Sequence, residues 1–191
     1  MGKILPFINQ KGGVGKTTSA VNVALSLAVS EVKTLIVDLD PQSNATTGLS
    51  DLIEKPSKHI YDVLIRGTDI KDAISKTQFP HLDIIPSTYD LVGAEIELVS
   101  IMAREYQLKI ALKKILRRYD IIILDCPPSL GLLTINALTS AHAIIIPIQC
   151  EYYALEGLSQ LLNTIRLVQK HLNRNLEIAG VLMTMYDSRL N

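Results

Sequence analysis

The chain has 191 residues, of which 48% are hydrophobic and 20% are charged, and this composition argues against a disordered or fibrous protein. It contains 19 basic and 19 acidic residues, so net charge favours neither nucleic acid nor an anionic membrane as a partner, and any such contact must be a local patch. Cys126 and Cys150 are too far apart for a CxxC motif and too few for a disulfide scaffold. No apolar run approaches the roughly 20 residues that a membrane span requires. We expect a soluble, cytoplasmic protein.

Six short apolar, β-branched runs are predicted as strands, at residues 4–9, 33–38, 82–86, 119–125, 143–149 and 178–184. Longer segments with apolar residues at helical spacing lie between most of them, at 17–29, 94–118 and 155–172. This alternation predicts an α/β fold, a doubly wound and mostly parallel sheet flanked by helices. We expect residues 1–191 to be one domain that lacks its C-terminal portion, because no helix follows to cover the second face of the sixth strand.

Four loops of the predicted sheet carry the polar residues of interest. In parallel sheets a ligand binds beyond the carboxyl ends of the strands. The loops that leave those ends contain residues 9–16, 38–44, 125–131 and 149–157. We expect the four loops to converge on one rim of the sheet.

A glycine-rich segment, Lys-Gly-Gly-Val-Gly-Lys-Thr-Thr at residues 11–18, follows the first predicted strand and opens the first predicted helix, as a phosphate-binding loop does. Its glycines let backbone N–H groups point at phosphate oxygens, and the helix adds its N-terminal partial positive charge. Lys16 supplies a full charge to the β- and γ-phosphates, and the Thr17 hydroxyl suits Mg²⁺. A turn that only caps the helix is the alternative. The predicted nucleotide contacts are Lys11, Gly12, Gly13, Val14, Gly15, Lys16, Thr17 and Thr18.

Two strand ends carry carboxylates that could hold the metal and align a water molecule. Asp125 closes an apolar strand, as in a Walker B motif, and can hold Mg²⁺ directly or through water. Asp38 and Asp40 share one face of the second strand, so both can turn toward the site. Capping of the following turn is the alternative for these residues, because it is a frequent role of Asp.

The phosphate loop has one departure from the general pattern, since Gln10 stands where a Gly is usual. With Lys11 at its start, it resembles the deviant Walker A motif of the ParA/MinD/nitrogenase iron protein superfamily. Further blocks resemble the ParA/Soj family of partitioning ATPases, and together they cover essentially the whole chain. These blocks are residues 40–46, 93–98, 125–131, 147–158 and 183–189.

The resemblance implies an ATP- and Mg²⁺-dependent ATPase that forms a homodimer with ATP, binds nonspecific DNA on the nucleoid and is stimulated by a ParB-type partner. It implies that Lys11 reaches the nucleotide of the partner subunit, that Asp40 orients the attacking water and that Asp38 supports the metal. Residues 127–131 resemble the switch II loop, which senses the γ-phosphate, and Met185 lies in the segment that approaches adenine. Family members continue past this point into helices whose basic residues contribute to DNA contact.

Three alternatives of function remain open. A MinD-like membrane-cycling ATPase for division-site placement shares the phosphate loop but would carry a C-terminal amphipathic helix. An iron–sulfur relative would hold a cluster with Cys126 and Cys150 between two subunits. A pure binding module would hold ATP without turnover, and in that case Asp40 would have no catalytic role.

A basic stripe lies in the predicted helix over residues 94–118. Lys109, Lys113 and Arg117 recur at four-residue spacing, and Lys114 and Arg118 join them. Contact with DNA phosphates is one interpretation. We expect instead a solvated face whose cations complement the C-terminal end of the helix dipole.

Overall fold

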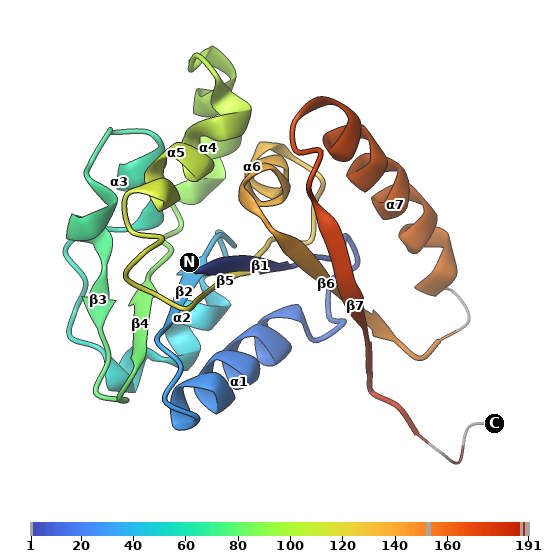
Figure 1. The fold of residues 1–191 in the computed structure, drawn as a ribbon, viewed down its shortest axis with the longest axis horizontal. Coiled ribbons are helices and arrows are strands. Elements are labelled where there is room, and N and C mark those ends of the chain that lie inside the picture. The colour runs from blue at the N-terminus through green and yellow to red at the C-terminus, as the bar shows by residue number, and fades with distance from the viewer. Residues whose placement is uncertain (1, 152–153, 188, 190–191) are drawn as a thin grey trace.

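The computed structural model describes residues 2–151, 154–187 and 189, without the side chains of 154–156, and its centre is a seven-stranded sheet (Figure 1). The strand order is β3-β4-β2-β5-β1-β6-β7. All six predicted strands are present, as β1 (Lys3–Phe7), β2 (Thr34–Asp38), β4 (Leu82–Ile85), β5 (Ile121–Asp125), β6 (Ala143–Gln149) and β7 (Glu177–Thr184). They pair in parallel. The strand that was not predicted, β3 (Ser75–Lys76), is a two-residue edge strand antiparallel to β4.

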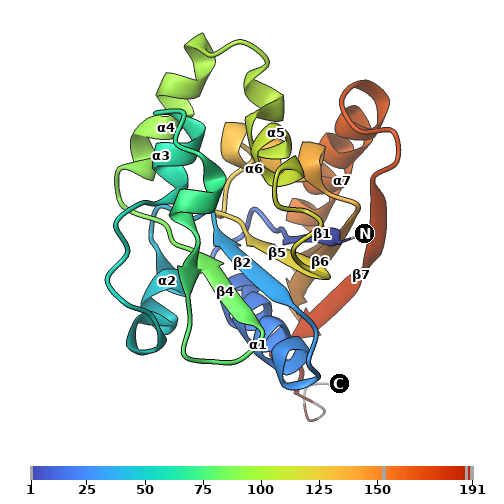
Figure 2. The same cartoon turned by 60° about the vertical axis from the view of Figure 1, so that its left-hand side comes forward.

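Helices cover both faces of the sheet, which confirms the predicted doubly wound α/β fold. One face carries α1 (Lys16–Val29), with α2 (Asn44–Gly48) packed beside it. The other face carries α3 (Ile60–Leu64), α4 (Leu91–Glu97), α5 (Gln107–Lys113), α6 (Leu132–Ser140) and α7 (Ala154–His171) (Figures 1 and 2). Two clusters of buried apolar side chains follow from this arrangement, one on each side of the sheet.

The helix that follows the phosphate loop lies on the sheet through small side chains. Ala20, Ala24 and Ala28 recur every four residues along α1, and all three are buried against β1, β2 and β5. Residues at this spacing share one face of a helix. The sequence therefore places a flat, narrow strip of α1 against the strands.

The prediction of one helix over residues 94–118 is wrong. The segment forms α4, a 3₁₀ turn (Leu98–Ser100), a second 3₁₀ turn (Arg104–Tyr106) and then α5. Between the two turns, Ile101 is extended and Ala103 is left-handed, with φ of 53°. The side chain of buried Asn136 on α6 stabilises this break, because it accepts a hydrogen bond from the Leu108 N–H (3.0 Å) and donates to the Arg104 carbonyl (2.7 Å). A tertiary contact thus overrides the helical periodicity of the segment.

Helix α6 was not predicted because it has no polar face. Seven of its nine residues are buried, including two threonines, a serine and Asn136. Its N-terminal amides are satisfied from outside the helix, by the carboxylate of Glu95 on α4. Burial on all sides removes the 3.6-residue pattern that sequence analysis depends on.

The described part of the chain contains no helix that is both long and apolar enough to cross a membrane.

Candidate nucleotide-binding site

The loop after β1 has its backbone held open by two features. Buried Asn9 donates to the Pro147 carbonyl at 2.7 Å and accepts from the Lys11 N–H at 3.0 Å, so it ties the loop to β6. Gly13 and Gly15 have φ of 74° and 82°, which side chains rarely adopt. Around Gly13 no other atom lies within 4 Å of where a Cβ would stand. The result is an open concave turn that a phosphate can approach closely.

The N-terminus of α1 faces this turn with unused donors. Gly15 is the N-cap, no side chain caps the helix, and the helical hydrogen bonds begin with Ser19 N–H to Gly15 O at 2.9 Å. The amides of the preceding three residues, 16–18, therefore have no partner within the helix. The first turn contains no acidic residue. A helix N-terminus of this kind attracts an anion.

Lys16 lies within the turn rather than in solvent. Its side-chain Nζ donates to the Lys11 carbonyl at 3.1 Å, and the residue is buried. Burial lowers the pKa of Lys16, although the nearby carboxyls of Asp125 and Asp40 act in the opposite direction. A buried ammonium group that lacks a full ion pair is strongly stabilised when a negatively charged phosphate binds beside it.

Asp125, at the end of β5, has two buried carboxylate oxygens that lack any hydrogen-bond partner among the described residues. Burial raises its pKa to about 7, and the charge of Asp38 adds to this effect. The hydroxyl of Thr17 lies close enough to act in the opposite direction. Orphaned buried carboxylate oxygens fit a hard cation such as Mg²⁺. Thr17 lines the cavity and lies near Asp125, so its hydroxyl is a second oxygen of the kind that such a cation binds.

Asp38 and Asp40 differ in what their carboxylates do. Asp38 is fully buried and accepts from the Thr46 N–H (2.8 Å), the Thr46 hydroxyl (2.7 Å) and the Asp40 N–H (3.1 Å). Burial raises the pKa of Asp38 to about 6 in spite of these bonds. Asp40 accepts from the Gln42 N–H at 2.9 Å and lines the cavity described next. This geometry favours Asp38 as an organiser of the loop and leaves Asp40 to face a ligand.

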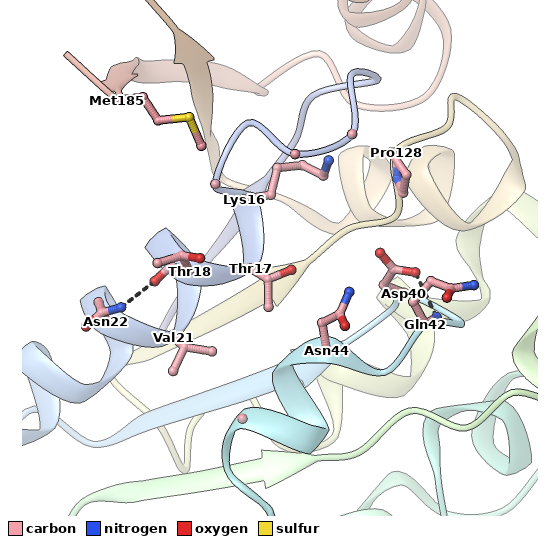
Figure 3. Close-up of a pocket in the computed structure, with 14 residues that line it drawn as sticks. Lys16, Thr17, Thr18, Val21, Asn22, Asp40, Gln42, Asn44, Pro128 and Met185 are labelled. Carbon is pink, nitrogen blue, oxygen red and sulfur yellow. Dashed lines mark hydrogen bonds between the residues drawn. The ribbon is translucent and has the colours of Figure 1, made fainter. Parts of the chain in front are cut away.

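A cavity of about 540 Å³ lies in front of the turn, at the carboxyl ends of the strands (Figure 3). Seven of the predicted nucleotide-site residues line it together with Asp40, namely Gly12, Gly13, Gly15, Lys16, Thr17, Thr18 and Met185. Val14 is instead buried, with its carbonyl accepting from the Thr184 hydroxyl at 2.8 Å. Lys11, Asp38 and Asp125 are also outside the lining.

Sequence reasoning missed part of the cavity wall. Val21, Asn22 and Gly48 line it without belonging to any motif. The signal for Asn22 is its spacing, since it lies four residues after Thr18 on the same face of α1 and donates to the Thr18 carbonyl at 2.8 Å. Gln42, Asn44 and Pro128 also line the cavity, and they lie in blocks that the sequence already singled out.

Lys11 does not line the cavity and contacts Glu151 instead. Its Nζ forms an ion pair with Glu151 at 3.1 Å, and both side chains are exposed. Exposed ion pairs of this kind contribute about 0–1 kcal/mol to stability. The lysine could therefore exchange Glu151 for another anion at little cost. Glu151 belongs to the block at residues 147–158, of which Tyr152 and Tyr153 lie outside the described residues; so does Ser188 in the last block.

The remaining candidates lie away from the cavity. Cys126 is fully buried, burial raises the pKa of its thiol, and Cys150 is only partly exposed, which disfavours a cluster shared between subunits. The predicted stripe of cations is exposed, and Lys114 pairs with Asp69 at 3.3 Å. Lys109 and Lys113 line a separate cavity of about 460 Å³. Exposure and surface pairing fit the prediction of a solvated cationic face.

Comparison with known proteins gives matches along nearly the whole chain. A family model described as an AAA domain matches residues 2–178. Sporulation initiation inhibitor protein Soj of Bacillus subtilis is 58% identical over 193 residues, covering 100% of this chain and 76% of that protein. Chromosome partitioning protein ParA of Myxococcus xanthus is 52% identical over 191 residues, which cover 100% of this chain and 68% of that protein. A crystal structure of a protein from Mycobacterium smegmatis, described as cobyrinic acid a,c-diamide synthase with bound ADP and magnesium, matches with a TM-score of 0.93 and 42% sequence identity. The match covers 99% of this chain and 77% of that one.

Proposed function

This chain belongs to the Soj/ParA family of chromosome-partitioning ATPases, and from that premise we propose that it cycles between an ATP-bound homodimer on nonspecific DNA and an ADP-bound monomer. The observation that carries the proposal is the glycine turn with the open N-terminus of α1 behind it. Together they present three unused amides and a buried ammonium group to one cavity, and the two buried carboxylate oxygens of Asp125 lie next to Lys16 and Thr17, which line that cavity. This set of groups is complementary to the charges of a nucleoside triphosphate and its magnesium ion.

Each group has a distinct part in the proposed reaction. Amides of residues 12–18 and the Lys16 ammonium group bind the β- and γ-phosphates and neutralise charge as it develops there. Thr17 and Asp125 would hold Mg²⁺, which would supply positive charge that stabilises the phosphate oxygens during the reaction. Asp40 is within the cavity wall and orients the attacking water. Asp38 supports the metal by holding the Asp40 and Thr46 backbone in place.

Dimerisation is proposed to depend on Lys11. Among the described residues its ammonium group pairs only with exposed Glu151, and Lys11 does not line the cavity. A phosphate of a partner subunit would offer a doubly charged acceptor in a less hydrated place, which outcompetes a single exposed carboxylate. ATP binding would thus stabilise the dimer, and loss of the γ-phosphate would weaken it.

DNA and a ParB-type protein complete the proposed cycle. The relatives that match at 58% and 52% identity are described as Soj and ParA, and we extend their partitioning role to this chain. A MinD-like membrane cycle has no comparable observation in its favour. Co-sedimentation with DNA and with lipid vesicles, each with ATP, separates the two functions. Binding to DNA phosphates must weaken steeply across a salt series.

The decisive measurement is calorimetric titration with magnesium and a non-hydrolysable ATP analogue. We expect uptake by the wild type and a Kd about 10- to 150-fold weaker for Lys16→Ala, because a charge-assisted contact of about 1.5–3 kcal/mol is lost. Circular dichroism controls for folding. Wild-type protein that is folded and takes up no nucleotide would overturn the proposal. Asp40→Ala should bind the analogue normally and release phosphate more slowly, and unchanged release would remove Asp40 from the reaction.

A further inference from the structure

Helix α4 and the turns on either side of it carry an exposed apolar stripe, called here the α4 stripe, that the proposed catalytic site does not use. The stripe consists of Tyr89, Val92, Ile96, Val99 and Met102, whose side chains are between 47% and 90% exposed. The first four recur at the three- and four-residue spacing that places side chains on one face. The opposite face, with Leu91, Ala94 and Leu98, lies in the core. Figure 2 shows that the segment after α4 rises above the neighbouring helices.

The same helix is bonded to the loop that follows β5. The carboxylate of Glu95 accepts from the Leu132 N–H at 2.6 Å and from the Leu133 N–H at 3.2 Å, at the N-terminus of α6. It also packs against Gly131, where an added Cβ would stand 2.4 Å from Glu95 Oε1. The loop at 127–131, which is the candidate γ-phosphate sensor, leads directly into these bonds. Movement of α4 would therefore move the end of that loop.

The segment before α4 is bonded to the other catalytic loop. The Ser87 hydroxyl donates to the Asp40 carbonyl at 2.7 Å, and the Ser87 N–H donates to the Thr46 hydroxyl at 2.9 Å. Thr46 in turn donates to Asp38. Both loops on the γ-phosphate side of the cavity are thus bonded to α4 or to the residues just before it.

Charge on this segment indicates what covers the stripe. Residues 87–105 contain four acidic side chains, Asp90, Glu95, Glu97 and Glu105, and one basic side chain, Arg104. Because Arg104 pairs with Glu105 and Glu95 is bonded to α6, the negative charge left for a partner comes from Asp90 and Glu97. A second copy docked through the same surface would oppose like charges, and an anionic membrane would be repelled. A basic segment with apolar residues on one face would satisfy both the stripe and the surrounding charge.

We propose that the α4 stripe is the docking surface for a basic amphipathic segment of the stimulating protein, and that Glu95 passes this contact to the loop at 127–131. The inference rests on the proposed function, since it concerns how that ATPase is stimulated. Docking on the stripe shifts α4, Glu95 carries the N-terminus of α6 with it, and the loop closes on the γ-phosphate. Glu95 is a positioning residue in this scheme and does not touch the nucleotide.

The test compares three variants with the cognate ParB-type protein as the probe. Ile96→Gln/Val99→Gln removes the centre of the stripe, Leu167→Gln is the matched control because it changes a 60% exposed residue on α7, and Glu95→Gln weakens the link to α6. For each variant we would measure basal ATPase, stimulated ATPase, nucleotide Kd and the Kd for the probe.

The stripe variant should keep basal ATPase and nucleotide Kd within twofold and lose at least tenfold in probe affinity and in stimulation, while Leu167→Gln behaves as wild type. Glu95→Gln should bind the probe and nucleotide normally but be stimulated at least fivefold less, a split that a purely structural role would not produce.

Normal stimulation of the stripe variant would overturn the proposal, as would an equal loss in Leu167→Gln. A change in the ATP-dependent dimer mass, or a loss of vesicle binding, in the stripe variant would assign the surface to a second copy or to a membrane instead. If the wild type binds and hydrolyses ATP but the probe never stimulates it, the stimulated cycle itself fails, and this is seen before any variant is made.

Discussion

Replacement of Asp125 by Asn should make the nucleotide-free protein lose less stability than the wild type as the pH rises, although it removes a proposed metal ligand. Burial raises the pKa of Asp125 from 3.8 to about 7, so folding favours the protonated form. Below about pH 4 the carboxyl is neutral in both states and the folded wild type bears no penalty. As the pH rises through 4 to 7, the unfolded chain releases its proton first, and wild-type stability falls by an amount set by the pKa difference.

The magnitude follows from that interval. About three pKa units at about 1.4 kcal/mol each give an upper limit of about 4 kcal/mol, and water entering the open cavity reduces it to about 2–4 kcal/mol. Asn has nearly the same shape as Asp and cannot ionise, so the variant does not bear the free-energy cost of a buried charge that the wild type bears as the pH rises. Its own unpaired amide destabilises the protein by about 1–3 kcal/mol at every pH. The difference in unfolding free energy between Asp125→Asn and wild type should therefore rise by about 2–4 kcal/mol between pH 4 and pH 8.

Urea denaturation without magnesium or nucleotide at pH 4, 5, 6, 7 and 8 measures this difference. The reasoning fails if the difference is the same at all pH values, or if it falls as the pH rises. The same variant should bind magnesium nucleotide more weakly. A protein that sacrifices stability at this position for ligand binding shows the usual trade-off of a functional site.

Three further predictions concern the loop and its support. Lys11→Ala should bind nucleotide within about threefold of wild type but lose ATP-dependent dimerisation by light scattering; a persistent dimer would show that the Lys11 ammonium group is not an interface contact. Gly15→Ala should lose about 1–2 kcal/mol in urea denaturation, because φ of 82° is left-handed, and unchanged stability would mean that the turn relaxes easily. Asn136→Ala should lose about 2–4 kcal/mol, because it leaves the buried Leu108 N–H and Arg104 carbonyl unpaired at the start of α5, and a loss under 1 kcal/mol would show that water replaces the amide.

The strands and the phosphate loop could be predicted because their signals are local. An apolar, β-branched run such as β5 predicts a strand that is buried on both faces. The glycines at 12, 13 and 15 indicate a turn that other residues do not form easily. Helix α1 was found from its periodicity to within one residue at its start. In each of these cases the information lies within about 15 consecutive residues.

The misses arise where distant residues decide the local structure. The break after α4 depends on Asn136, which is 28 and 32 residues away from the two residues it bonds. Helix α6 has no polar face from which the sequence could predict it. The site shows the same limit, since the sequence could name Asp38 and Asp125 but could not tell that one is fully hydrogen-bonded and the other orphaned. That difference depends on the position of Thr46, which a pattern of strand-end carboxylates does not contain.

The alanine strip of α1 sets how deep the phosphate site can be. Three buried methyl groups take up little space between α1 and the sheet, so the helix packs close to the strands. A Val or Leu at Ala20 would raise the near end of the helix, tilt its amides off the cavity and separate Thr17 from Asp125. Side chains that never touch a ligand thereby fix the distance between the two proposed holders of its metal ion.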